Sequence, residues 1–178
     1  MMKKKIIITG GLGYIGTELC KLYSGVSWNN SITVIDNRFS SERVNQIRNW
    51  NMNFVHGDIL DKTLINKYCK DADVVHHLAG ITDVPRTRSE SNDDKDNQIK
   101  IVAEEGTQNI LDAISDKCKI IFPSTHVVYE GIEKIKNEIT EDEEVKPILS
   151  YSKSKALNEK QLKNSGKNYI ILRLGSVY

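Results

Sequence analysis

Six short apolar runs, separated by segments with helical spacing of apolar residues, constrain the fold of this 178-residue chain more than any other feature. The runs span residues 4–9, 31–36, 52–57, 72–80, 118–125 and 168–175. Strands that alternate with helices require right-handed crossovers, which produce a mostly parallel sheet covered by helices on both faces. The sequence therefore predicts a doubly wound α/β fold with at least six strands.

The segments between these runs predict five helices and two long polar loops. The helices are expected around residues 14–22, 41–50, 61–68, 94–115 and 150–164. The polar stretches 81–97 and 130–147 both follow the carboxyl ends of strands. Ligands bind at that edge of an open α/β sheet, so each stretch is a candidate substrate wall or lid. A solvated surface excursion is the alternative for each.

Composition excludes several classes of partner. Lys and Arg number 25 against 24 Asp and Glu, so the formal net charge of +1 lacks the basic footprint of a nucleic-acid binder. Only Ile6–Ile8 follow the basic start before a threonine and glycines intervene, which is too short for an export signal, and no run is long enough to cross a membrane. The three cysteines are odd in number and far apart. We therefore expect one cytoplasmic domain over residues 1–178.

The stretch "IIITGGLGYIG" places a glycine-rich turn directly after the first run. Gly11, Gly13 and Gly16 fit G-x-G-x-x-G, and Gly10, Gly13 and Gly16 fit a second register. Glycines here allow a tight turn, leave room for a pyrophosphate and let the helix approach the strand, so that its first N–H groups meet the negative charge. A plain strand-to-helix turn is the alternative. In this context the pattern favours a Rossmann-type dinucleotide site.

Asp36 ends the second run about 20 residues beyond the last glycine. A carboxylate at this place accepts hydrogen bonds from the adenosine ribose, and its charge repels a 2′-phosphate. The position therefore favours NAD over NADP, although the nearby Arg38 offsets part of that preference. A turn or helix-capping residue is the alternative for Asp36.

Tyr151 and Lys155 lie four residues apart in good helical sequence, so one turn places both on the same face. A cation close to a phenol favours the phenolate, and we expect Lys155 to lower the pKa of Tyr151 and fit it for proton transfer. Taken alone, the pair favours a solvated lysine-rich face. His56, His76 and His77 lack the company of other ligands, and we expect no metal site.

The order and spacing of these motifs resemble those of the extended short-chain dehydrogenase/reductase family, which contains the nucleotide-sugar epimerases and dehydratases. The similar segments are "TGGLGYIG", "VIDN", "HGDILD", "HLAG", "FPSTHVVYEG", "YSKSKALNEK" and "LRLGSVY". They extend over the whole chain.

The resemblance implies roles for particular residues. Tyr151 would be the acid/base, Lys155 would lower its pKa and bind the nicotinamide ribose, and Thr125 would hydrogen-bond the reacting oxygen. The remaining NAD contacts would come from Gly10, Gly13, Tyr14, Ile15, Gly16, Asp36, Asn37, Asp58, Ile59, Leu78, Ala79 and Gly80. The substrate would be a nucleotide sugar, and a homodimer through the two long helices is common in the family. Without the resemblance, Thr125 reads as a strand-end hydroxyl that binds backbone.

The match departs from the family in three places. Ala103 stands where the family usually carries a cofactor-binding asparagine, three residues before Gly106. His126 and Val127 replace the Asp-Glu pair of the 4,6-dehydratase branch, so epimerisation or carbonyl reduction is favoured over dehydration. The small substrate-binding domain that follows in the family is expected to be absent from this chain. Ala103 and the short chain together support an alternative, a dinucleotide-sensing module without chemistry.

Overall fold

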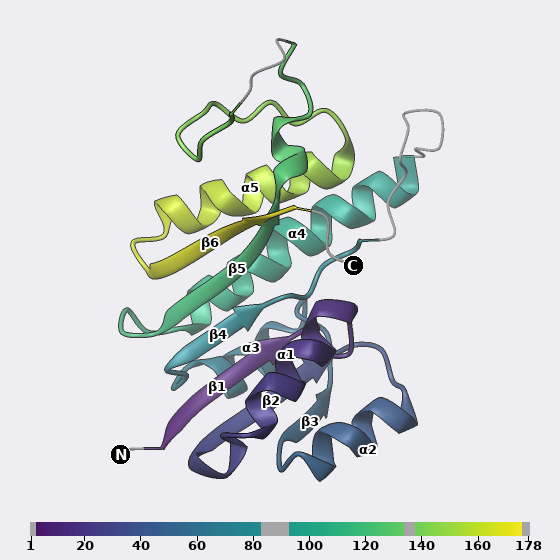
Figure 1. Cartoon of the computed structure of the whole chain (residues 1–178), viewed down its shortest axis with the longest axis vertical. Coiled ribbons are helices and arrows are strands. Elements are labelled where there is room, and N and C mark those ends of the chain that lie inside the picture. The colour runs from purple at the N-terminus through teal and green to yellow at the C-terminus, as the bar shows by residue number, and fades with distance from the viewer. Residues whose placement is uncertain (1–2, 83–92, 134–137, 176–178) are drawn as a thin grey trace.

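The computed structural model describes residues 3–82, 93–133 and 138–175 and contains one six-stranded sheet in the order β3-β2-β1-β4-β5-β6 (Figure 1). All five pairings are parallel. The strands are β1 (Lys4–Thr9), β2 (Asn30–Asp36), β3 (Asn53–His56), β4 (Val74–His77), β5 (Lys119–Thr125) and β6 (Asn168–Leu174). This arrangement confirms the doubly wound Rossmann-type sheet.

In the described part of the chain, five α-helices and two short 3-10 helices connect the strands. They are α1 (Tyr14–Ser24), η1 (Ser27–Asn29), α2 (Ser41–Asn49), α3 (Lys62–Cys69), α4 (Asp93–Ala113), η3 (His126–Tyr129) and α5 (Ser150–Asn164). Of the polar stretch 81–97, residues 93–97 form the start of α4, which begins one residue before the helix expected from residue 94, and residues 83–92 lie outside the described part. Acidic residues fill the first turn of α4, where the helix dipole favours negative charge.

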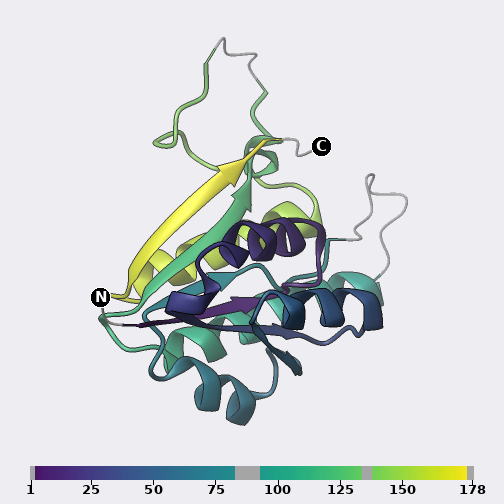
Figure 2. The same cartoon turned by 60° about the horizontal axis from the view of Figure 1, so that its bottom comes forward.

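The two faces of the sheet carry separate hydrophobic cores. Strand side chains alternate between faces, so Ile6 and Ile8 of β1 pack under α1 and α2, whereas Ile7 packs under α3, α4 and α5. Figure 2 shows α3 on the side of the sheet opposite to α1. Helices therefore cover both faces at the centre of the sheet, as the apolar runs predicted.

Strands β5 and β6 are covered on one face only in the described part of the chain. Ile171 packs into the core beneath α5, and the alternation places its neighbours Ile170 and Leu172 on the opposite face. These two side chains are 39% and 43% exposed. The last two strands thus present an apolar face to solvent.

Candidate functional site

The carboxyl ends of the parallel strands lie at one edge of the sheet. Between β1 and β4 the order in which the strands are added to the sheet reverses. Ligands of doubly wound folds bind at such a switch point. A cleft of about 530 Å³ lies at this edge. All the residues predicted to bind cofactor or to act in catalysis line this cleft: Gly10, Gly13, Tyr14, Ile15, Gly16, Asp36, Asn37, Asp58, Ile59, Leu78, Ala79, Gly80, Thr125, Tyr151 and Lys155.

The glycine turn is packed so tightly that side chains would not fit. Gly10 has φ +70°, and a Cβ on it would lie 2.6 Å from the Ala79 nitrogen. A Cβ on Gly16 would lie 2.5 Å from the Gly10 carbonyl oxygen, because α1 begins directly against the turn. The first N–H groups of α1 have no partner within the helix and face the cleft at Tyr14 and Ile15. This geometry fits a pyrophosphate.

Asp36 is 4% exposed and joins the glycine turn to the segment that follows β2. One carboxylate oxygen accepts a hydrogen bond from the Leu12 nitrogen at 2.9 Å, and the other accepts from the Arg38 nitrogen at 2.9 Å. The Arg38 side chain lies 3.5 Å from the same carboxylate. The oxygen that accepts from Leu12 keeps a lone pair for a ligand hydroxyl, so the turn-residue and the ribose-binding interpretations are compatible.

The next strand supplies a second carboxylate. Asn37 donates to Asp58 at 2.9 Å, and the other Asp58 oxygen accepts from the Leu60 nitrogen. Ile59 is buried against α4, where a Cβ on Gly106 would lie 2.3 Å from its side chain. Gly106 therefore serves the close approach of α4 to this wall of the cleft.

Lys155 occupies the floor of the cleft beside Tyr151. Its ammonium donates to the Pro123 carbonyl oxygen at 3.0 Å and lies 5.9 Å from the centre of the Tyr151 ring. Burial lowers the pKa of Lys155 from 10.5 to about 8. The pair thus forms as the helical spacing predicted.

The expected lowering of the Tyr151 pKa is wrong for this structure. Burial raises the pKa of the Tyr151 phenol. The ammonium of Lys155 is bound to a carbonyl rather than to the phenol oxygen, so the loss of hydration has the larger effect.

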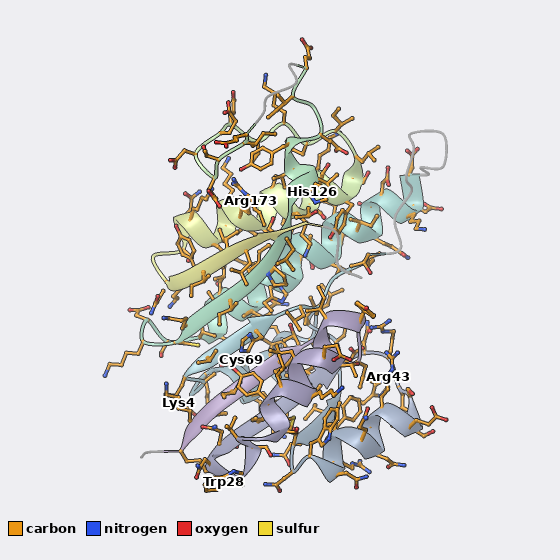
Figure 3. All side chains as sticks on the ribbon, viewed as in Figure 1. Lys4, Trp28, Arg43, Cys69, His126 and Arg173 are labelled. Atoms are coloured by element: carbon orange, nitrogen blue, oxygen red, sulfur yellow. The ribbon has the colours of Figure 1, made fainter. Side chains whose placement is uncertain are left out.

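Thr125 and His126 mark the end of β5. The Thr125 hydroxyl oxygen accepts from the Val127 nitrogen at 3.2 Å, which is the backbone-binding role expected without the family argument. Its hydrogen remains able to donate into the cleft. His126 lies 3.1 Å from the Leu174 carbonyl oxygen and thereby fastens η3 to β6. Figure 3 shows His126 beside Arg173 at this end of the sheet.

The described residues of the acidic stretch 130–147 do not line the cleft. Several of them line a second cavity of about 480 Å³ together with His126 and Arg173. The Thr140 carbonyl oxygen accepts a hydrogen bond from the Tyr129 hydroxyl, and the Glu141 carbonyl oxygen accepts one from the Arg173 guanidinium. Residues 134–137 of this stretch lie outside the described part.

Ala103 does not line the cleft. Its carbonyl oxygen accepts from Asn158 of α5 at 2.8 Å, while Val102 is the residue of this turn that faces the cleft. The Asn158 amide also binds Thr107 and Gln161, so it is occupied within the helix interface. This turn of α4 therefore offers Val102 and no amide to the cleft.

His76 and His77 serve as neutral structural groups. His76 bonds the Tyr23 hydroxyl at 2.8 Å, and His77 lies between the hydroxyls of Thr9 and Thr107, 3.0 Å from each. Burial lowers the pKa of His76 to about 4 and that of His77 to about 3. No cluster of three or more His, Cys, Asp or Glu within the described ranges is placed to hold a metal ion.

Further cleft residues were not predicted, or were named without a firm role: Ile35, Arg38, Gly57, Ile81, Thr82, Val102, Pro123, Ser124, Leu174 and Gly175. Most of them are neighbours in the sequence of a predicted residue at a strand end. The tendency of ligands to bind at the carboxyl ends of strands could therefore have found them. Pro123 contributes a backbone carbonyl, for which the sequence contains no signal.

A parallel sheet whose glycine turn, acidic strand end and switch point share one cleft defines a dinucleotide-binding domain of the Rossmann type. The chain matches the NAD dependent epimerase/dehydratase family over residues 6–178 and belongs to that family.

Relatives agree with this assignment. The chain is 36% identical over 149 residues to a CDP-paratose 2-epimerase of Salmonella typhi, covering 77% of this chain and 41% of the relative. It is 30% identical over 181 residues to a UDP-glucose 4-epimerase of Lactobacillus helveticus, covering 97% and 52%. The crystal structure of a UDP-glucuronic acid 4-epimerase from Bacillus cereus in complex with NAD has a TM-score of 0.78 and 26% identity, covering 97% and 56%. The chain thus spans about half the length of these proteins.

No helix in the described part is long and apolar enough to span a membrane.

Proposed function

We propose that this chain is the NAD-binding part of a nucleotide-sugar epimerase or related reductase that transfers a hydride at a sugar carbon. The observation that carries the proposal is the convergence of the glycine turn, Asp36 and the Tyr151-Lys155 pair on one cleft. The family supports it, because the relatives named above are epimerases of nucleotide sugars.

In this proposal the pyrophosphate of NAD lies against Gly10, Gly13 and Gly16 and the first N–H groups of α1. Asp36 accepts from the adenosine ribose, and Asn37 with Asp58 and Ile59 borders the adenine. Leu78, Ala79 and Gly80 follow the end of β4 beside the cofactor. The crowded Gly10 and Gly16 support this arrangement, since any larger residue would displace the turn.

Proton transfer is assigned to the other end of the cleft. When bound, NAD would supply the hydride acceptor for the sugar carbon. Tyr151 then takes or returns the proton of the sugar hydroxyl, Thr125 donates to the same oxygen, and Lys155 binds the nicotinamide ribose. The raised pKa of Tyr151 leaves its phenol protonated at neutral pH. Proton uptake therefore requires the charge of Lys155 to stabilise the phenolate, and this attraction strengthens when water is excluded from the cleft.

A sensor that binds dinucleotide without chemistry is the second candidate. Ala103 favours it, because the wall of α4 offers Val102 and no amide to the cleft. His126 and Val127 disfavour dehydration but leave epimerisation and carbonyl reduction open. Three buried free cysteines agree with a cytoplasmic location, and a homodimer through α4 and α5 stays a prediction.

The Tyr151→Phe substitution tests the enzymatic proposal. Removing the phenol oxygen should abolish hydride exchange with UDP- or dTDP-hexoses and leave NAD affinity largely unchanged, because the glycine turn is untouched. Calorimetry with NAD, NADH and NADPH and absorbance of the reduced cofactor measure the two effects. Tyr169→Phe, at a 38% exposed position on β6, is the matched control.

Each outcome separates the candidates. Unchanged turnover in Tyr151→Phe would contradict the assigned acid/base. Binding of a dinucleotide without exchange in the parent chain would favour the sensor. Absence of binding to all three dinucleotides would defeat both candidates.

A further inference from the structure

Helix α5 begins without a cap of its own. Its N-cap residue is Leu149, which has no side-chain acceptor for the free N–H groups of the first turn. The Glu130 carboxylate, from a distant part of the chain, instead binds the two residues just before the helix and one side chain of its first turn. One of its oxygens accepts from the Ile148 nitrogen at 2.6 Å, from the Leu149 nitrogen at 2.7 Å and from the Ser152 hydroxyl.

The position of Glu130 is fixed by the backbone around it. Glu130 follows η3 directly, and two backbone bonds tie this segment to the approach of α5: Lys146 N to Val128 O at 2.8 Å, and Gly131 N to Lys146 O at 2.9 Å. A Cβ on Gly131 would lie 2.5 Å from the Lys146 carbonyl oxygen, so the two segments touch at the backbone. Figure 1 shows η3 leaving β5 beside the start of α5.

These contacts close a ring around the proposed catalytic residues. Thr125 caps η3 through the Val127 nitrogen, η3 leads to Glu130, and Glu130 binds the start of α5. One turn further, Lys155 of α5 returns to β5 through the Pro123 carbonyl. Tyr151 lies between Leu149 and Ser152, the two points at which Glu130 binds the helix.

We propose that Glu130 is a positioning residue, which fixes the first turn of α5 and so sets where the Tyr151 phenol lies in the cleft. The inference rests on the proposed role of Tyr151 in proton transfer. A carboxylate suits this position because negative charge is favourable at a helix N-terminus, and Lys153 adds to the attraction. Burial alone raises the pKa of Glu130, but the bonds from Ser152, Leu149 and Ile148 outweigh it and hold this pKa below its ordinary value.

Three variants test the proposal. Glu130→Ala removes the acceptor, Glu130→Gln keeps a carbonyl oxygen at the same reach, and Glu144→Ala removes an exposed acid from the same stretch as a control. The readouts are amide hydrogen exchange at Ile148 and Leu149 and the titration of Tyr151 by NMR of 13Cζ-labelled tyrosine. The Tyr151→Phe spectrum assigns the signal.

We expect Glu130→Ala to lose protection at both amides and to shift the pKa of Tyr151 down towards its ordinary value of 10, because a frayed first turn admits water to the phenol. Turnover of a nucleotide sugar should fall about tenfold or more. Glu130→Gln should restore all three properties towards those of the parent, and Glu144→Ala should change none. A purely structural role would lower the melting temperature and leave the Tyr151 titration where it was.

Unchanged amide protection and an unchanged Tyr151 titration in Glu130→Ala would overturn the inference. If Glu130→Ala does not fold, a Glu130→Gln protein without the parent's protection and titration overturns it equally. A different result would contradict the proposed function: no dinucleotide binding and no turnover in any variant, including the parent protein.

Discussion

Gly16 and Gly25 lie near the two ends of the same helix, α1, and meet opposite surroundings. A Cβ on Gly16 would contact the backbone of Gly10 and Gly11 at 2.5 to 2.8 Å, whereas a Cβ on Gly25 would meet nothing within 4 Å. Backbone atoms cannot swing aside as a flexible side chain can. The identity of Gly16 is therefore fixed by packing rather than by conformational freedom.

We predict that Gly16→Ala lowers the free energy of unfolding by about 1–3 kcal/mol, the usual effect of overpacking, and abolishes NAD binding because the turn has to open. Gly25→Ala is the matched control and should be neutral or slightly stabilising. Chemical denaturation and calorimetry measure the two properties. Equal stability and affinity in the two variants would contradict the packing argument.

Charge states of single residues depend on burial, which sequence spacing does not report. The four-residue spacing of Tyr151 and Lys155 correctly predicted that they share a face. It could not predict that Lys155 donates to a backbone carbonyl, or that desolvation raises the pKa of Tyr151. The prediction from the sequence considered the charge of Lys155 beside Tyr151 but not the loss of hydration of the phenol.

At the level of elements, one buried polar chain joins β1, β4, α4 and α5. His77 lies between the Thr9 and Thr107 hydroxyls, and Thr107 also accepts from Asn158 at 2.9 Å. His77 and Thr107 are almost fully buried. The chain of hydrogen bonds therefore links the strand beside the glycine turn to the helix that carries Tyr151.

Thr107→Val should lower the free energy of unfolding by about 1–3 kcal/mol, because the hydroxyl is lost and the His77 ring nitrogen is left buried without a partner. Thr63→Val makes the same change at an exposed position of α3 and should have a much smaller effect. Thermal and denaturant unfolding of the two variants measure the difference. Similar losses in both would show that the polar chain contributes nothing specific.

Most elements were predictable because apolar periodicity records burial. The helix expected over residues 150–164 has the predicted bounds, and each apolar run coincides with a strand, although β2 begins one residue before its run. The largest error in a strand is at residues 72–80, of which only Val74–His77 pair. Residues 78–80 are apolar or small because they border the cleft, and periodicity cannot distinguish that environment from a strand.

The site was predictable to the extent that it lies on strand ends and on the glycine turn. Glu130 was not, since its partner Leu149 lies 19 residues away and carries no capping signal of its own. Contacts that depend on how an irregular segment folds back produce no periodic pattern in the sequence. The second cavity beside Arg173 could not be predicted for the same reason, because residues of the irregular stretch 130–147 line it.

For the whole molecule, the bare face of β5 and β6 is the main departure from a closed two-sided fold. Ile170 and Leu172 form an exposed apolar pair on the edge strand of the described sheet. Edge strands with apolar side chains promote association, and lysine at such positions opposes it.

We therefore predict that Leu172→Lys reduces concentration-dependent self-association. Leu22→Lys adds the same charge at a more exposed leucine of α1, away from the edge strand, and should have no such effect. Sedimentation velocity over a range of concentrations distinguishes them. If both variants associate like the parent, the bare face is not the surface involved.

Lys155 has one more consequence, for the reactivity of the folded protein as a whole. Its pKa of about 8 leaves a large neutral fraction in mildly alkaline solution, and a neutral amine is a nucleophile. An amine with the ordinary lysine pKa of about 10.4 stays mostly protonated under the same conditions and reacts more slowly with aldehydes. An aldehyde small enough to enter the cleft would form an imine with Lys155 and release water, so the floor of the cleft is an attachment point for a covalent label.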